Sequence, residues 1–225
     1  MLELIFTSDG SKTIFNPEVG ETYHSRHGAL QESRHVFLNS GLRYFIADKN
    51  IEELRVLEVG FGTGLNFLLS AEFCLQHHFR MDYVGIEVSP LNQSLISQTG
   101  YDDHVTPGLW ESFLEKYPSS LKNSVRINNQ STLKVAHCAL LEFQSQQSFD
   151  VLYFDAFAAV HQPEIWSHES LAHVCQFLKI GGVFVTYAIT GNLKRSLKSL
   201  GFTIEKIPGA LGKREMLRAQ KTYVS

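Results

Sequence analysis

The sequence of 225 residues predicts an α/β fold in which a mainly parallel, seven-stranded sheet has helices on both faces and a small N-terminal cap. From residue 54 onward, short apolar runs alternate with segments of helical periodicity, which is typical of such sheets. One apolar run leads directly into a glycine-rich turn and a helix, an arrangement that α/β folds use to bind nucleotides. The composition, 44% hydrophobic and 19% charged, is that of a soluble globular protein, and no linker divides the chain.

Residues 1–52 are expected to form the cap. Two β-prone runs, 2–7 and 11–15, flank Asp9-Gly10, a dipeptide that favours a hairpin turn. A helix is predicted over residues 30–45.

Residues 53–225 are expected to form the main domain. The predicted strands are 55–59, 82–88, 133–137, 149–154, 183–188, 202–204 and 216–219. The last two are expected to pair antiparallel at the edge of the sheet. The predicted helices are 65–76, 91–98, 170–178 and 193–200. Gly181-Gly182 is expected to end the third of them, before the strand 183–188.

The most specific local feature is the run of three alternating glycines from Gly60 to Gly64, placed between a strand and a helix. Glycine permits a tight turn and a close approach of ligand to backbone, and the helix start offers free N–H groups. The spacing is GxGxG with an acid two residues earlier, whereas pyrophosphate-binding loops use GxGxxG. It resembles the first motif of class I methyltransferases, which have a Rossmann-like fold and bind S-adenosylmethionine. That resemblance implies cofactor contacts from Glu58, Gly60, Phe61, Gly62, Gly64 and Asn66.

Two further strand ends are candidates for cofactor binding. Glu87 ends the second strand of the main domain, where an acid accepts hydrogen bonds from ribose hydroxyls; the alternative is an exposed carboxylate without a ligand. The third strand is followed by His137-Cys138-Ala139-Leu140 and lacks the acid that often binds adenine. Backbone groups near Cys138 are the expected substitute.

Asp155 follows the apolar strand 149–154, at the edge of the sheet where ligands of open α/β folds bind. We therefore expect it beside the methyl group that is transferred. The alternative is that Asp155 caps the next element, since aspartate is a good N-cap.

An ordered set of motifs along nearly the whole chain resembles the MnmC/MnmD family of tRNA 5-aminomethyl-2-thiouridine methyltransferases. The motifs are Asp9-Gly10-Ser11, Glu21-Thr22-Tyr23-His24-Ser25, Gly28-Ala29-Leu30-Gln31-Glu32-Ser33, the glycine loop, Phe154-Asp155-Ala156-Phe157, Pro163-Glu164-Ile165-Trp166, and the run from Pro208 to Met216. The chain departs from the family pattern at Ala156, at Ala158-Ala159 and at Asn192-Leu193-Lys194, and the last difference bears on tRNA contacts.

The resemblance implies methylation of the amine of 5-aminomethyl-2-thiouridine at the tRNA wobble position, with Asp155 as the catalytic acid–base group. It implies that Tyr23 closes over the cofactor and that Lys213 and Arg214 lie near phosphates of the tRNA anticodon stem-loop. The candidates to stack on the base are Tyr23, Phe157, Trp166 and Tyr187, although each is also a plausible core aromatic. No second glycine fingerprint follows, so we expect a stand-alone methyltransferase without an FAD domain.

The charge distribution bears on an RNA partner. Residues 190–225 hold eight Lys or Arg and two Glu, a net charge of +6, which leaves −9 for the remainder of a chain whose total is −3. Such asymmetry indicates either a phosphate-binding face or a solvated surface.

Other function classes are excluded or kept as alternatives. The three cysteines form no CxxC pair, the histidines lack metal-ligand spacing, and no apolar run is long enough for a membrane span, so we expect a cytoplasmic protein without metal or membrane. The alternatives are a class I methyltransferase acting on another amine, in a small molecule or protein, a non-catalytic relative that binds S-adenosylmethionine or RNA, and an aminopropyl transferase.

Overall fold

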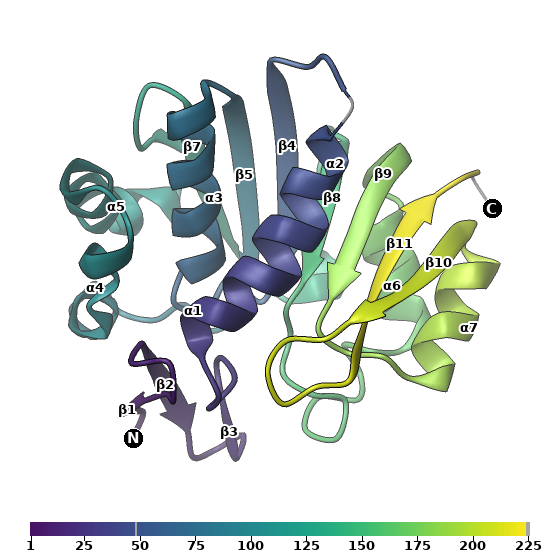
Figure 1. Ribbon diagram of the computed structural model, residues 1–225, viewed down its shortest axis with the longest axis horizontal. Helices are drawn as coiled ribbons and strands as arrows, with labels where there is room; N and C mark the ends of the chain where they lie inside the picture. Colours follow the sequence, from purple (N-terminus) through teal and green to yellow (C-terminus); the bar gives the residue numbers. More distant parts are fainter. Residues whose placement is uncertain (48, 224–225) are drawn as a thin grey trace.

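The computed structural model of the protein describes residues 1–47 and 49–223. Its main sheet has eight strands: β4 (Glu53–Val59), β5 (Arg80–Glu87), β6 (Val125–Arg126), β7 (Ser131–His137), β8 (Phe149–Phe154), β9 (Leu178–Thr186), β10 (Phe202–Pro208) and β11 (Glu215–Lys221). Their order across the sheet is β10-β11-β9-β8-β4-β5-β7-β6 (Figure 1). All seven predicted strands of the main domain are present, and the two-residue strand β6 is the additional one.

The five central strands, β7, β5, β4, β8 and β9, are mutually parallel, and the strands at both edges are antiparallel. The predicted antiparallel pairing of the last two strands is confirmed, with Phe202 opposite Lys221. The C-terminal ends of the central strands therefore meet at one edge of the sheet.

Helices cover both faces of the sheet (Figure 1). One face carries α3 (Leu65–His77), α5 (Pro107–Ser120) and the continuous helical segment formed by α1 (Ala29–Glu32), η1 (Ser33–Arg43) and α2 (Tyr44–Ile46). The other face carries α6 (His168–Cys175) and α7 (Gly191–Ser199). The remaining short elements are α4 (Gln93–Ile96), η2 (Ser97–Thr99), η3 (Tyr101–His104) and η4 (Leu140–Glu142).

Side-chain alternation along the strands separates two hydrophobic cores. In β4, Val56 belongs to the core that contains Phe37 and Leu68, whereas the next residue, Leu57, belongs to the core that contains Leu171. Successive strand residues point to opposite faces, so a sheet buried on both sides needs apolar residues at nearly every position. This explains why β8 is buried along its whole length.

The sequence-based assignment missed one helix and misplaced the boundary between α6 and β9. No helix was predicted over α5, although its Thr106-Pro107 start is a recognised helix signal. The helix predicted for residues 170–178 ends at Cys175, and residues from Leu178 already pair with β8. The glycines at 181 and 182 lie inside β9, next to a register irregularity, and do not separate a helix from a strand.

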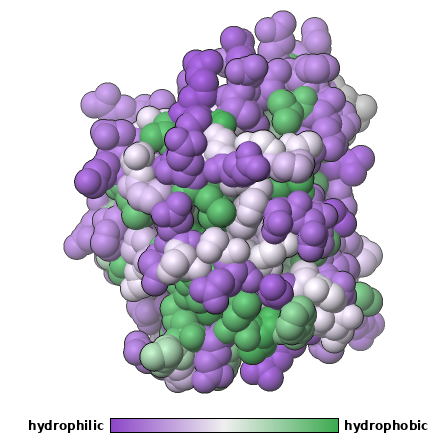
Figure 2. Space-filling model, turned by 90° about the vertical axis from the view of Figure 1, so that its left-hand side faces the viewer, coloured by the Kyte–Doolittle hydropathy of each residue, from purple (hydrophilic) through white to green (hydrophobic). Residues whose placement is uncertain are grey.

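The N-terminal segment forms a second, small sheet from β1 (Glu3–Phe6), β2 (Lys12–Asn16) and β3 (Glu21–Thr22). The predicted hairpin is confirmed in β1 and β2, which pair antiparallel. On the face of the molecule that carries α4 and α5, hydrophobic residues gather at the end where this hairpin lies, and Phe6 is 73% exposed (Figure 2).

The helix after this sheet packs closely on the main sheet. Its central part, η1, is a π-helix, in which Ser40 Oγ donates a hydrogen bond to His35 O five residues earlier. A Cβ atom at Gly41 would lie 2.8 Å from Tyr153 Cε1 of β8. The glycine therefore allows the approach that places Glu32, at the end of α1, beside the sheet edge.

We predict a pH-dependent contribution of His24 to stability. This buried side chain lies 3.1 Å (Nδ1) from Thr13 Oγ1, and burial lowers its pKa to about 4, against the opposing charges of Glu32 and Asp9. The unfolded chain, with a histidine pKa of about 6.5, then binds more protons between these two values, so stability falls as the pH drops through that window.

Urea unfolding at pH 7.5 and 4.5 measures this loss. We expect His24→Asn to remove about 2–3 kcal/mol of the wild-type difference between the two pH values. The exposed residue His168 provides the control, as His168→Gln. Equal pH dependence in wild type and His24→Asn would contradict the assignment.

Candidate active site

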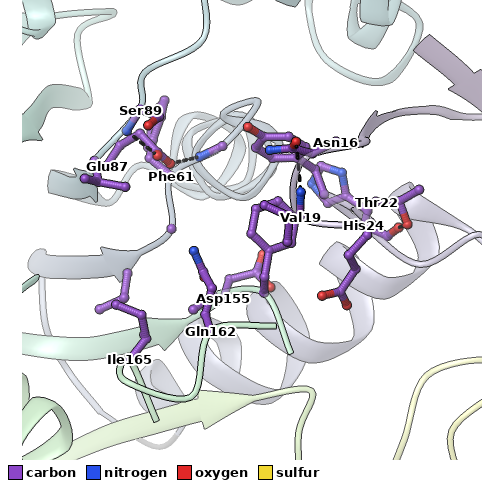
Figure 3. A pocket seen from close by; sticks show the side chains of 18 of the residues that line it. Asn16, Val19, Thr22, His24, Phe61, Glu87, Ser89, Asp155, Gln162 and Ile165 are labelled. Atoms are coloured by element: carbon purple, nitrogen blue, oxygen red, sulfur yellow. Dashed lines mark hydrogen bonds between the residues drawn. The ribbon is translucent and has the colours of Figure 1, made fainter. Parts of the chain in front are cut away.

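A cavity of about 310 Å³ lies at the C-terminal ends of β4, β5, β7 and β8 (Figure 3). Each strand contributes a lining residue where it ends: Val59, Glu87, Cys138 and Asp155 lie at or just after these ends. The opposite wall comes from the N-terminal segment, including Asn16, Val19 and residues 21–25. This is the position at which open α/β folds bind their ligands.

The glycine loop forms the floor of the cavity. The backbone N–H groups of Gly60 and Phe61 both donate to Ile86 O, which ties the loop to β5. Gly60 has φ 82°, and a Cβ atom there would lie 2.5 Å from Asp155 O. The loop therefore passes too close to β8 for any residue except glycine at position 60.

Glu87 lies at the end of β5 and lines the cavity. Its carboxylate accepts hydrogen bonds from Gly62 N, at 2.9 Å, and from Ser89 N, at 3.0 Å. Two carboxylate oxygens have about four acceptor sites, so two remain for further donors such as ribose hydroxyls.

Asp155 begins the loop after β8, and its backbone N–H donates to Val59 O at the end of β4. Its Oδ2 accepts a hydrogen bond from Asn66 Nδ2 at 2.8 Å. Burial raises the pKa of Asp155 well above its usual value, and the nearby carboxylates of Glu32 and Glu21 raise it further. The Asn66 hydrogen bond and the Lys213 ammonium lower the pKa but do not outweigh these effects.

Glu58 and Asn66 lie beneath the cavity and not on its wall. Glu58 is fully buried and accepts hydrogen bonds from Tyr83 Oη, at 2.7 Å, and from Asn66 Nδ2, at 2.8 Å. Burial and the charge of Asp155 raise the pKa of Glu58 well above its usual value. The predicted contact of these two residues with the cofactor stays a prediction, and their observed partners are Asp155 and Tyr83.

Three other predicted site residues lie outside the cavity lining. Gly64 precedes α3 with φ 80° and packs against Phe113. Trp166 is buried, and its Nε1 donates to Phe157 O at 2.7 Å, so it supports the loop after β8. Arg214 is exposed on the loop between β10 and β11.

The remaining predicted residues come together at the cavity. They are Gly60, Phe61, Gly62, Glu87, Cys138, Tyr23, Asp155, Phe157, Tyr187 and Lys213. Tyr23 and Phe157 face each other with ring centroids 5.0 Å apart, and Tyr187 Oη donates to Ala156 O at 2.9 Å. Burial and the Glu87 charge raise the pKa of Tyr23 to about 12, so this residue is an uncharged phenol at neutral pH.

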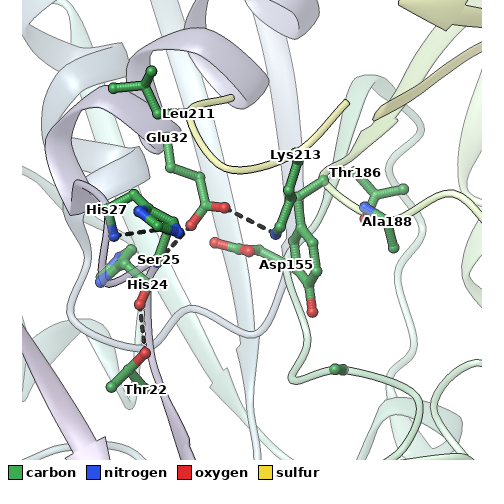
Figure 4. A network of polar contacts seen from close by, with 12 residues as sticks. Thr22, His24, Ser25, His27, Glu32, Asp155, Thr186, Ala188, Leu211 and Lys213 are labelled. Atoms are coloured by element: carbon green, nitrogen blue, oxygen red, sulfur yellow. Dashed lines mark hydrogen bonds and ion pairs between the residues drawn. The ribbon is translucent and has the colours of Figure 1, made fainter. Parts of the chain in front are cut away.

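Lys213 does not point toward an exterior phosphate. Its Nζ lies 3.1 Å from Glu32 Oε1 and 3.6 Å from the centre of the Tyr187 ring (Figure 4). This orientation follows from the packing of the loop between β10 and β11 on the N-terminal segment, where Leu211 N also donates to Gln31 Oε1 at 3.3 Å. The predicted phosphate contact of Lys213 stays a prediction.

Two functional candidates were not singled out from the sequence. Glu32 is buried and lines the cavity close to Asp155, and Glu21 lines it nearby, with Oε2 accepting from Ala158 N at 2.8 Å. Both fall inside motifs of the family resemblance. Their proximity to Asp155 depends on contacts between distant parts of the chain, which no local pattern reveals.

The residues present fit S-adenosylmethionine. Glu87 keeps acceptor sites of the kind that ribose hydroxyls require, and Val88, Cys138 and Leu140 add a partly apolar wall of the kind that an adenine ring requires. In the described part of the chain, no three His, Cys, Asp or Glu side chains gather so that they could hold a metal ion. Within residues 1–47 and 49–223, no helix combines the length and apolar character needed to cross a bilayer.

Comparison with curated proteins finds relatives along most of the chain. Proteins of Acidovorax sp. and Acinetobacter baylyi, both named tRNA 5-methylaminomethyl-2-thiouridine biosynthesis bifunctional protein MnmC, are 29% and 30% identical over 92% and 94% of this chain. The chain spans only about a third of their length, 34% and 36%.

Among solved structures, MNMC2 from Aquifex aeolicus covers 100% of this chain and 72% of its own, with a TM-score of 0.80 and 24% identity. That similarity confirms the predicted fold class. Residues 105–222, a little more than half of the chain, match the family described as S-adenosyl-L-methionine-dependent methyltransferase. The protein therefore belongs to the S-adenosyl-L-methionine-dependent methyltransferases.

Proposed function

We propose that the protein methylates the primary amine of 5-aminomethyl-2-thiouridine at the wobble position of tRNA. The observation that carries this proposal is the cluster of three carboxylates, Glu21, Glu32 and Asp155, beside the glycine loop. An alkyl amine is a cation at neutral pH, so it suits a cavity end that is rich in carboxylates. The names of the curated relatives support this modified uridine as the substrate.

The cofactor is expected to lie along the glycine loop, with its ribose at Glu87 and its adenine near Cys138. When bound, it supplies a sulfonium methyl group: the new N–C bond forms as the S–C bond breaks, and sulfur keeps the electron pair. The protein's task is then to bind the amine, remove one proton and align the nitrogen with the methyl carbon.

Asp155 is the proposed proton acceptor. An ammonium group has no free electron pair, so the amine must lose a proton before it attacks. Because the pKa of Asp155 is raised, it lies closer to the pKa of the amine. Proton transfer to Asp155 is therefore less unfavourable than transfer to an ordinary aspartate. Gly60 and the backbone contact to Val59 O hold Asp155 at the loop.

The uridine must leave the anticodon stack to reach this depth, as nucleotides do in other base-modifying enzymes. Phe157, Tyr187 and Tyr23 line the cavity and are the proposed aromatic surfaces for the base. Trp166 donates a hydrogen bond to the backbone carbonyl of Phe157, lies outside the cavity lining and is not proposed to touch the base.

The direct test is methyl transfer from labelled S-adenosylmethionine to tRNA that carries 5-aminomethyl-2-thiouridine, with unmodified tRNA as the control and nucleoside mass spectrometry as the readout. We expect the methylaminomethyl nucleoside only on the modified tRNA. Asp155→Asn should lower the rate about 100-fold or more while cofactor affinity is kept, and Asp103→Asn, at an exposed site, should not change it. Methylation of neither tRNA by a protein that binds the cofactor would refute the proposed substrate.

We predict that Asn66 acts on the proton chemistry of Asp155. Because the Asn66 amide lowers the pKa of Asp155, its removal in Asn66→Ala should move the acid limb of the kcat/KM profile to higher pH. Cofactor affinity, measured by calorimetry, should change little, and Asn123→Ala at an exposed turn is the control. An unmoved acid limb with a large loss of cofactor affinity would instead support direct cofactor binding by Asn66.

We predict that Arg214 contacts a tRNA phosphate. Its exposed position next to Lys213 places it at the rim of the cavity. Arg214→Gln should weaken tRNA binding and reduce the slope of log K against log salt concentration by about 1. Lys122, before β6 at the opposite end of the sheet, provides the control as Lys122→Gln. Identical slopes for wild type and Arg214→Gln would exclude this phosphate contact.

A further inference from the structure

The cavity already binds one primary alkyl ammonium group, that of Lys213. Its Nζ lies between the Glu32 carboxylate, at 3.1 Å, and the face of the Tyr187 ring, at 3.6 Å (Figure 4). A carboxylate and an aromatic face are the two surfaces that attract such a cation most strongly. Lys213 therefore shows how this end of the cavity, which is lined by Glu32, Asp155 and Tyr187, can hold a primary ammonium group.

The position of Glu32 is fixed independently of Lys213. Its side chain is only 6% exposed, and its Oε2 accepts a hydrogen bond from Ser25 N at 2.8 Å. Oε1 interacts with Lys213 Nζ, and each oxygen keeps a free acceptor site. A second amine can therefore bind without breaking the backbone contact.

The local charge favours another cation. Glu32, Glu21 and Asp155 all contribute to the electrostatic environment of Tyr187 and raise its pKa, after burial as the main cause. Among the described residues that line the cavity, Lys213 is the only Lys or Arg. Lys213 faces three acidic residues, Glu32, Glu21 and Asp155, so acidic groups outnumber basic ones at this end of the cavity.

We propose that Glu32 recognises the primary ammonium group of the methyl acceptor, an inference that rests on the proposed function. The substrate amine binds between Glu32 and Asp155 beside Tyr187 and takes over part of the contacts of Lys213 Nζ. Asp155 accepts the proton, whereas Glu32 pairs with the ammonium group and selects for the amine. A uridine whose C5 substituent is neutral or anionic gains nothing from this carboxylate or is repelled by it.

The test compares two anticodon stem-loop RNAs that differ only at the wobble uridine, one with a 5-aminomethyl and one with a 5-methyl group. Binding is measured by fluorescence anisotropy in the presence of S-adenosylhomocysteine. We expect the wild type to prefer the aminomethyl RNA and Glu32→Gln to reduce that preference about 10- to 100-fold, with unchanged affinity for the methyl RNA. Glu18→Gln, at an exposed position outside the cavity lining, should keep the full preference.

Lys213→Met provides a second variant that leaves Glu32 in place. Removal of the competing ammonium should keep or increase the preference for the aminomethyl RNA. Loss of that preference in Lys213→Met, or its survival in Glu32→Gln, would overturn the inference, as would equal weakening of both RNAs by Glu32→Gln.

Failure of the proposed function gives a different result. A wild type that prefers the aminomethyl RNA, loses that preference in Glu32→Gln and yet methylates neither RNA supports recognition by Glu32 while refuting the proposed reaction. A wild type that methylates the aminomethyl RNA, together with a Glu32→Gln variant that keeps the preference, supports the reaction and refutes recognition by Glu32.

Discussion

The amide of Asn66 donates to two carboxyl groups at once, Glu58 and Asp155, each at 2.8 Å. These residues come from α3, from β4 and from the end of β8, and Tyr83 of β5 adds a second donor to Glu58 at 2.7 Å. Burial of a carboxyl group without hydrogen-bond partners costs several kcal/mol of folding free energy. These hydrogen bonds therefore favour the observed arrangement of α3, β4, β5 and β8. The glycine loop, which follows the end of β4 at Val59, then has to pass against the backbone of Asp155, and Gly60 permits this.

The same arrangement controls the chemistry of the site. Glu58 lies beneath Asp155, and burial raises the pKa of both carboxyl groups. The Asn66 amide lowers both pKa values because it donates a hydrogen bond to each group. On the cavity side, Glu32 and Glu21 add negative charge, and Lys213 offsets part of it. Asp155 therefore lies between a buried acid and an open acidic cavity. This environment suits the proposed role of Asp155 as proton acceptor, because the carboxyl is less acidic than usual and the neighbouring carboxylates favour a cation.

Much of this fold was predictable because its signals are local. Alternating apolar runs placed the seven strands, and the glycine spacing with Glu87 and Asp155 at strand ends located the site. The start of α5 at Thr106-Pro107 is also a local signal. Gly181 and Gly182, in contrast, predicted a boundary between a helix and a strand, whereas β9 continues through both glycines. The pairing of Glu32 with Lys213 had no local signal, since the two residues are 181 positions apart. The burial of Glu58 and Asn66 under the loop depends likewise on packing between elements.

In the basic C-terminal segment, residues 190–225, several of the positive side chains are paired within the fold and are not free to bind a phosphate. Lys221 Nζ donates hydrogen bonds to the backbone carbonyls of Cys175 and Leu178. Arg218 forms an ion pair with Glu205, and Lys213 forms one with Glu32. The exposed remainder includes Arg195 and Lys198 on α7 and Arg214 on the loop before β11. Because β9 and β11 are antiparallel, with Thr186 opposite Leu217, that loop and the start of α7 both lie at the cavity end of the sheet. The net charge of the segment overstates its exposed positive surface. Arg214 and the start of α7 lie at the cavity end of the sheet, the edge from which the proposed tRNA substrate would reach Asp155.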